Sequence, residues 1–175
     1  MWDFKSGIFY ILYCILGKWL PESRRFRPGK HIRVVLAKGI LDSTGKNINI
    51  EKNAYFTPGV SLGDYSGIGV NCSMNAVGKG KIIIGKYVMM GPECIVYTTQ
   101  HRTDDINTPM QFQGSVDPKD VIIGDDVWIG SRVKIMPGVK IGNGCIIGAG
   151  AVVTKSIPAY SVAVGVPAKV IKSRK

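Results

Sequence analysis

The chain has 175 residues, of which 45% are hydrophobic and 20% are charged, a balance typical of one folded domain that excludes a disordered chain. Lys and Arg outnumber Asp and Glu by 23 to 12, a net charge of +11 that first suggests nucleic acid or an anionic membrane as a partner. The charge lies at the two ends, however: residues 1–47 carry +6, residues 169–175 carry +4, and residues 48–168 are nearly neutral. Nucleic acid is not expected as a partner, because no motif for stacking or reading bases is present.

The N-terminal segment, residues 1–47, combines an apolar run with a basic one. The apolar run, residues 8–16, is shorter than the roughly 20 residues that span a bilayer, and no signal-peptide cleavage site follows it. We therefore expect a cytoplasmic protein, one that can also lie at the inner face of the cytoplasmic membrane. Two interpretations of the segment stay open: a helix that caps the fold, or a peripheral contact of residues 1–33 with an anionic membrane surface.

A six-residue repeat organises the region 48–168. Fourteen large apolar anchors follow this step in three runs: Ile50, Phe56, Leu62, Ile68 and Met74; Ile84, Met90 and Val96; and Ile123, Ile129, Ile135, Ile141, Ile147 and Val153. A period of six fits neither a helix nor a hairpin array, and predicts an all-β solenoid of short strands joined by tight corners. Three hexads complete one triangular coil, so we expect four to five coils.

Two further positions of the repeat are also regular. Cys72, Cys94 and Cys145 stand four residues after an anchor, which predicts packing inside the coil rather than disulfide or metal chemistry. Glycine directly follows eight anchors, and we expect it to supply the backbone conformation that a corner needs.

The repeat breaks at a short bulge around residues 77–80 and at a long loop, about residues 102–121, which we expect to project from the solenoid as a functional element. His101 stands where the repeat gives way to this loop, and a neutral imidazole there can act as a general base near pH 7. Glu93 and the pair Asp104 and Asp105 are candidates for orienting it. The other histidine, His31, lies in the basic segment, and two distant histidines predict no metal site.

Several C-terminal motifs resemble the hexapeptide-repeat acyltransferases, above all the galactoside and maltose O-acetyltransferases and those of surface-polysaccharide assembly. The motifs are Ile123-Gly-Asp-Asp-Val-Trp-Ile-Gly-Ser131, Ile135-Met-Pro-Gly-Val-Lys-Ile-Gly142, Ile147-Gly-Ala-Gly-Ala-Val-Val-Thr-Lys155 and Gly165-Val-Pro-Ala-Lys169. The resemblance covers about residues 48–172. It implies a left-handed parallel β-helix that forms a homotrimer, with active sites between subunits and His101 as the catalytic base.

The resemblance also implies acetyl-CoA as the acyl donor and no metal. It places Ser131, Ala149, Thr154, Lys155 and Trp128 along the cofactor, Lys169 and Lys172 near its phosphates, and Asn71 against the sugar. The galactoside-type enzymes carry acidic residues in the bulge, where this chain has Gly78 and Lys79, and their N-terminal helical domain has no evident match here.

These departures favour a larger saccharide or glycolipid acceptor over a free sugar. The implied activity is acetylation of a hydroxyl group of a capsule, exopolysaccharide or lipopolysaccharide precursor. The alternatives are a streptogramin-type xenobiotic, an amino sugar, or a non-catalytic trimeric scaffold.

Overall fold

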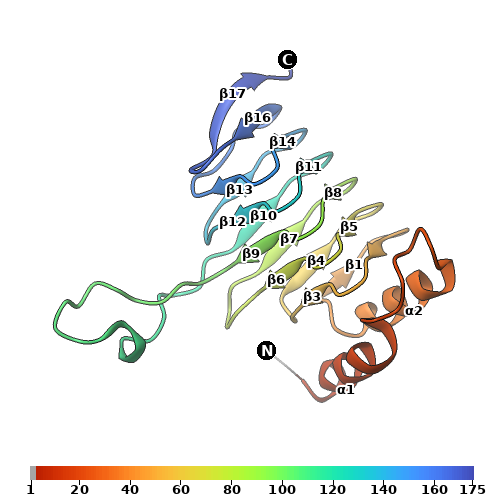
Figure 1. The fold of residues 1–175 in the computed structure, drawn as a ribbon. Coiled ribbons are helices and arrows are strands. Elements are labelled where there is room, and N and C mark those ends of the chain that lie inside the picture. The colour runs from red at the N-terminus through yellow and green to blue at the C-terminus, as the bar shows by residue number, and fades with distance from the viewer. Residues whose placement is uncertain (1–2) are drawn as a thin grey trace.

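The computed structural model describes residues 3–175, which form a left-handed parallel β-helix with helices at its N-terminal end (Figure 1). The helices are α1 (Phe4–Leu12), the π-helix η1 (Tyr13–Gly17), α2 (Arg27–Lys38) and the 3-10 helix η2 (Met110–Phe112). The expected fold class is confirmed, including the N-terminal helical segment and the one long extruded loop.

Three flat faces, here called X, Y and Z, make up the solenoid. Face X consists of β1 (Ser43–Thr44), β4 (Val60–Leu62), β7 (Ile82–Ile84), β10 (Val121–Ile123) and β13 (Lys140–Ile141). Face Y consists of β2 (Asn49–Ile50), β5 (Gly67–Ile68), β8 (Met89–Met90), β11 (Trp128–Ile129), β14 (Ile146–Ile147) and β16 (Ser161–Val164). Face Z consists of β3 (Tyr55–Phe56), β6 (Ser73–Asn75), β9 (Ile95–Tyr97), β12 (Lys134–Ile135) and β15 (Val152–Val153).

Each coil takes one strand from each face, so β1 to β15 make five complete coils. A partial sixth coil follows, in which Ile157 pairs with Ile141 and β16 pairs with β14. The chain then reverses, and β17 (Lys169–Ser173) runs antiparallel to β16 at the C-terminal end of the solenoid.

The six-residue anchors point into the coils. Ile50, Ile68 and Ile129 are completely buried, and strand pairing keeps them in register from one coil to the next, as between Ile129 and Ile147. The expected packing role of Cys72, Cys94 and Cys145 is confirmed, because all three are buried and unpaired. The core is therefore a stack of apolar layers, and the outward residues are left to form sites.

The expected reason for the glycines after the anchors is wrong. The left-handed backbone conformation belongs to the third residue after the anchor, as at Tyr65 (φ 57°) and Asn71 (φ 56°). The glycines are needed because successive coils approach closely: a Cβ on Gly63 would lie 2.6 Å from the carbonyl carbon of Gly85, and one on Gly130 would lie 2.6 Å from the amide nitrogen of Ala149.

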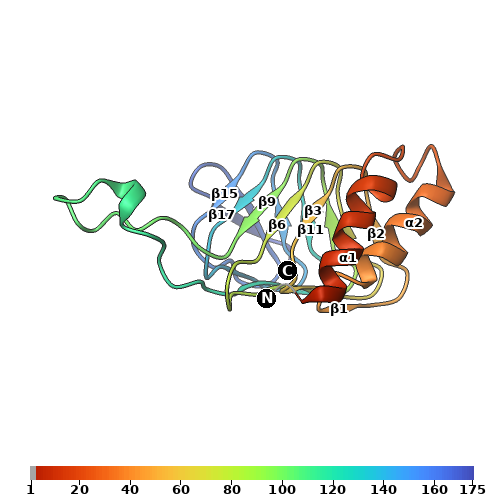
Figure 2. The same ribbon diagram turned by 90° about the horizontal axis from the view of Figure 1, so that it is seen from below.

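The N-terminal helices pack on the first coil, as Figure 2 shows from below. Helix α1 begins at a capping box, in which the Asp3 carboxylate accepts from the Ser6 amide at 2.6 Å. The Tyr13 hydroxyl donates to the carbonyl oxygen of Ala54 at 2.8 Å, and the buried Arg33 side chain of α2 donates to that of Ile50 at 2.7 Å. One side of the segment thus covers the open end of the solenoid. No helix within residues 3–175 combines the length and apolar character that crossing a bilayer requires.

Candidate active site

His101 stands at the base of the extruded loop, on the corner that leads from face Z to face X (the ZX corner). Its backbone pairs antiparallel with Ser115, and Arg102 N donates to the carbonyl oxygen of Gly114 at 3.0 Å. The two arms of the loop therefore begin as a short ladder, while the rest of the loop extends away from the body (Figure 1). The imidazole is exposed and makes no hydrogen bond or ion pair with any residue in the described part of the chain.

The completely buried Thr98 fastens this ladder to the solenoid. Its hydroxyl accepts from Val77 N at 2.9 Å and donates to the carbonyl oxygen of Asn75 at 3.2 Å, while its carbonyl accepts from Lys119 N at 2.7 Å. This one residue thus connects the bulge, the loop and face Z. His101, three residues farther on, is held at a defined place on the rim although its ring is free to meet a ligand.

The bulge forms the wall of a cavity of about 900 Å³ on the same ZX corner. Its lining includes Asp42, Tyr55, Lys79 and Lys81, so polar and charged groups surround an otherwise apolar pocket. A Cβ on Gly80 would lie 2.8 Å from both Thr98 and Pro118, which shows how closely the bulge and the loop approach each other.

Asn71 lies elsewhere, on the corner between faces Y and Z (the YZ corner). There, residues in the left-handed conformation stack one per coil: Asn53, Asn71, Glu93, Arg132 and Gly150. Asn53 Nδ2 donates to Asn71 Oδ1 at 2.9 Å, which leaves the amide nitrogen of Asn71 as a donor. Face Z separates Asn71 from His101, so a single chain does not bring the two together.

A groove of about 580 Å³ runs beside this stack and contains two basic residues that were not predicted, Arg132 and Lys134. It is lined by Asn71, Ser73, Glu93, Ile95, Arg132, Lys134, Gly150, Val152 and Val166. In the sequence, only the repeat marks Arg132. It comes three residues after the face-Y anchor Ile129, just as Asn71 comes three residues after the face-Y anchor Ile68.

The predicted cofactor residues divide between different parts of the last coils. Ser131 and Ala149 lie on neighbouring turns of the YZ corner, where the amide of Gly150 donates to Ser131 O at 2.8 Å. Thr154 and Lys155 lie exposed on the ZX corner after β15.

The remaining cofactor candidates lie on face Y and β17. Trp128 points outward from β11 between Met89 and Ile146 with half of its surface exposed. Lys172 and Lys169 are on β17, opposite Val162 and Val164 of β16. One chain therefore supplies these groups on more than one side of the solenoid.

None of the three candidates for orienting the imidazole, Glu93, Asp104 and Asp105, forms a hydrogen bond or ion pair with it. Glu93 lies on the YZ corner, where its carboxylate accepts from Arg132 Nε at 2.9 Å. The Asp105 carboxylate accepts from the Thr108 hydroxyl at 2.7 Å and from Asn107 N at 2.9 Å, and these bonds lower its pKa. Within the described residues, no three His, Cys, Asp or Glu side chains gather closely enough to hold a metal ion.

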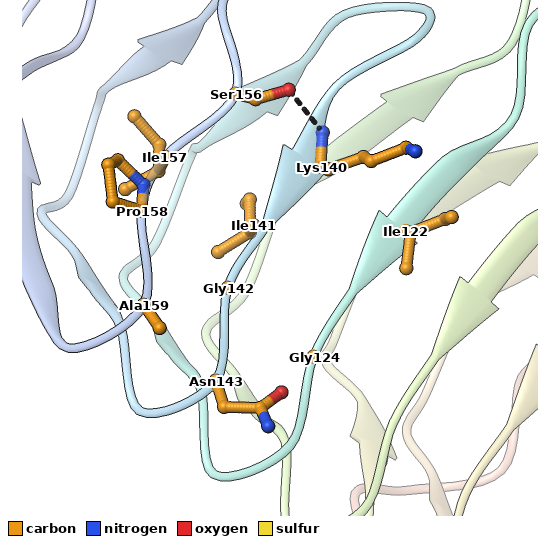
Figure 3. A pocket seen from close by; sticks show the side chains of 10 residues that line it. All are labelled: Ile122, Gly124, Lys140, Ile141, Gly142, Asn143, Ser156, Ile157, Pro158 and Ala159. Atoms are coloured by element: carbon orange, nitrogen blue, oxygen red, sulfur yellow. Dashed lines mark hydrogen bonds between the residues drawn. The ribbon is translucent and has the colours of Figure 1, made fainter.

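A second groove, of about 510 Å³, lies on face X over β10, β13 and the partial sixth coil (Figure 3). In it the backbone nitrogen of Lys140 donates to Ser156 Oγ at 3.0 Å, and the other lining groups are mainly aliphatic side chains and backbone. It contains none of the predicted site residues.

Comparison with known proteins places this arrangement in a family. Residues 120–155 match the model described as bacterial transferase hexapeptide (six repeats). The structure of a maltose O-acetyltransferase from Clostridium difficile 630 is 32% identical, with a TM-score of 0.79 over 98% of this chain and 87% of that chain. The chain belongs to the hexapeptide-repeat acyltransferases.

Two further relatives of this acyltransferase are informative. A galactoside acetyltransferase, solved in complex with coenzyme A, is 29% identical with a TM-score of 0.81, over 98% of this chain and 81% of that chain. A probable acetyltransferase of Mycobacterium tuberculosis is 47% identical over 93 residues, which are 53% of this chain but only 31% of that protein. Both structural matches cover 98% of this chain, so they include its N-terminal helices. The sequence had suggested no counterpart for these helices in the galactoside and maltose enzymes.

Proposed function

We propose that this acyltransferase transfers the acetyl group of acetyl-CoA to a hydroxyl group of a saccharide, with His101 as the general base. The observation that carries the proposal is the position of His101, exposed at the rim of the solenoid on a backbone ladder that Thr98 anchors. The nearly full-length likeness to a galactoside acetyltransferase bound to coenzyme A supports the donor.

In the proposed reaction the neutral imidazole of His101 removes the proton of the acceptor hydroxyl, whose oxygen attacks the thioester carbonyl carbon of acetyl-CoA. Backbone N–H groups hold the oxyanion of the tetrahedral intermediate, and the imidazolium returns its proton to the departing thiolate of coenzyme A. The products are the O-acetyl ester and free coenzyme A. Direct transfer of this kind needs no metal.

We propose that the cofactor lies along the C-terminal coils. Ser131 and Ala149 have short side chains on a corner where coils stack closely, and this allows a ligand to approach the backbone. Trp128 offers an exposed ring beside them, and Lys155, Lys169 and Lys172 offer positive charge for phosphate groups. Arg132 and Lys134 join these candidates because they line the groove on the same corner.

We further propose a homotrimer whose sites form between subunits. His101 and Asn71 lie at opposite ends of face Z, so a site that uses both takes one from each of two copies. The extruded loop supports this arrangement, because it reaches away from its own body (Figures 1 and 2) and carries exposed apolar side chains at Ile106 (94%), Phe112 (72%) and Met110 (62%). A neighbouring copy would cover them.

Mixed trimers test the shared site. His101→Ala and Asn71→Ala protomers, each impaired alone, are unfolded together and refolded as an equal mixture. Each site then has about a half chance of an intact His101 and about a half chance of an intact Asn71, so about a quarter of the activity returns. A mixture no more active than the separate variants contradicts a site shared between subunits.

The acceptor we propose is a capsule, exopolysaccharide or lipopolysaccharide precursor. The cavity on the ZX corner is large enough for more than one sugar, and Lys79 in its wall favours an anionic or phosphorylated acceptor. Release of free thiol from acetyl-CoA over a panel of sugars, nucleotide sugars, glycolipids, amino sugars and a streptogramin identifies the acceptor class.

The His101→Ala variant tests the base. Its kcat is expected to fall by about a hundredfold or more while its affinity for coenzyme A, measured by calorimetry, stays near that of the unmodified protein. His31→Ala, which removes the other histidine, an exposed residue of α2, is the matched control and is expected to retain full activity. A fully active His101→Ala protein contradicts the assignment of the base. If the unmodified protein binds no coenzyme A, the non-catalytic scaffold is the better interpretation.

A further inference from the structure

Helix α1 and η1 carry two apolar stripes, and only one of them is packed. The packed stripe contains Tyr13, which is completely buried, and the half-buried Phe9 and Tyr10, which pack against the core. The other stripe, here called the outer stripe, has spacings of three and four residues, as one face of a helix requires. It consists of Phe4, Ile8, Ile11 and Ile15 and, in the turn that follows η1, Trp19; these side chains are 43–87% exposed.

The outer stripe is too apolar for a surface that meets only water. Five large hydrophobic side chains over about four turns make a contiguous patch, and such patches mark contacts with proteins or membranes. Ile15 is 68% exposed and Trp19 is 65% exposed, so nothing in the described chain covers this end of the stripe. The opposite stripe is fixed on the first coil, so whatever meets the outer stripe meets the helix side-on.

The charge that follows the outer stripe along the chain indicates what covers it. Lys5 and Lys18 stand near its two ends, and the Lys18 ammonium lies 5.4 Å from the centre of the Trp19 ring. Arg24 and Arg25 follow in the turn before α2 and Arg27 is the first residue of α2; all three are exposed and form no ion pair with any described residue. Residues 1–47 as a whole carry a net charge of +6.

We propose that the outer stripe and these cations dock the protein on the surface of a bilayer that contains anionic lipid. The apolar side chains would enter the boundary between headgroups and acyl chains, with Trp19 at the level where amphipathic rings are favoured and Lys18 reaching back to the headgroups. Anionic headgroups complement the cations, whereas the same segment of a second copy would bring its own net charge of +6 against them.

Vesicle flotation of the full chain tests the proposal, with no assay of acetyl transfer, so its result is independent of the proposed activity. The probes are vesicles of pure phosphatidylcholine and vesicles in which about a quarter of the lipid is phosphatidylglycerol, at an ionic strength of about 0.1 M. We expect the protein to float with the anionic vesicles and to stay behind with the neutral ones.

Three variants separate the contributions. Replacing Arg24, Arg25 and Arg27 by Gln is expected to weaken binding on the order of a hundredfold, at roughly fivefold for each cation. Ile11→Gln with Ile15→Gln, which keeps good helix formers on the outer stripe, is expected to weaken it about tenfold or more. The matched control, Tyr65→Asn with Tyr87→Asn, removes two exposed aromatic rings from a corner of the solenoid and is expected to bind as the unmodified protein does.

Three results would overturn the proposal. The first is failure of the unmodified protein to float with anionic vesicles. The second is unchanged flotation of the Ile11→Gln, Ile15→Gln protein. The third is a loss of oligomeric mass of that protein in light scattering without vesicles, because the outer stripe is then a contact between copies.

Discussion

Arg33 carries its charge inside the molecule, and replacing it by Met tests what joins the N-terminal helices to the solenoid. None of its side chain is exposed. Nε donates to the Ile50 carbonyl at 2.7 Å, Nη1 to the carbonyls of Leu20 and Pro21 at 3.1 Å, and Nη2 to Ser23 Oγ at 3.0 Å. Nη2 also lies 3.8 Å from the Glu51 carboxylate.

The Arg33→Met variant keeps the volume of the stem but leaves three carbonyl oxygens without these donors. At about 1 kcal/mol for each unsatisfied acceptor, the loss is about 3 kcal/mol. Removing the cation from beside Glu51 adds to the loss, whereas the desolvation cost of the guanidinium disappears. We therefore expect the free energy of unfolding to fall by about 2–4 kcal/mol.

Urea unfolding at a fixed protomer concentration measures this loss, and hydrogen exchange locates it. Because a solenoid is stabilised by contacts between neighbouring coils, faster exchange is expected in residues 4–38 and the first coil, and not in the last coils. Lys86→Met is the control, since the Lys86 side chain is 57% exposed and its Nζ lies 3.9 Å from Asp64 Oδ2. Such an exposed ion pair contributes at most about 1 kcal/mol to the free energy of unfolding. An Arg33→Met protein as stable as Lys86→Met would refute the reasoning.

Two more predictions concern the same architecture. Burial alone raises the pKa of Glu51, but hydrogen bonds from Ser23 and Asn49 and the charge of Arg33 outweigh it and leave the pKa below the ordinary 4.5. The stability that the ionised carboxylate contributes is therefore complete above about pH 4.5 and lost as the pH falls through the folded value, so the melting temperature should decline there and Glu51→Gln should flatten the decline. Gly130→Ala should lower the free energy of unfolding by about 1–3 kcal/mol in the same urea assay, because its Cβ would meet the backbone of the next coil at 2.6 Å. Gly114→Ala, with φ +77° but open space around it, should cost only about 1 kcal/mol, and an equal effect of the two would contradict the close-approach argument.

The solenoid could be predicted from the sequence because its signal is one-dimensional. An inward position that recurs every six residues leaves the same mark at Ile50 and at Ile147, whatever the rest of the coil contains. The role of the glycines could not be found in this way. Whether Gly63 is needed for its φ or for the space beside it depends on the distance between coils, which the period does not contain.

The candidate site was only partly predictable for a similar reason. His101 is conspicuous because the repeat stops beside it, whereas Arg132 sits inside an unbroken repeat and resembles any outward residue. Its place beside Glu93 becomes visible only when residues 39 positions apart are stacked on one corner. The two N-terminal interpretations were also inseparable, since the packed and the outer stripes of α1 have the same helical period.

The division of the predicted residues over the solenoid is itself evidence about how a site is assembled. Ser131 and Ala149 lie on the YZ corner with Asn71, whereas Thr154 and Lys155 lie on the ZX corner with His101. The strands of face Z lie between the two corners of a single chain, so one ligand contacts both corners only if it lies across that face. If both groups serve one reaction, an arrangement in which the ZX corner of one copy faces the YZ corner of the next brings them together. Substitutions that only weaken the contact between copies should then lower activity even where they touch no ligand.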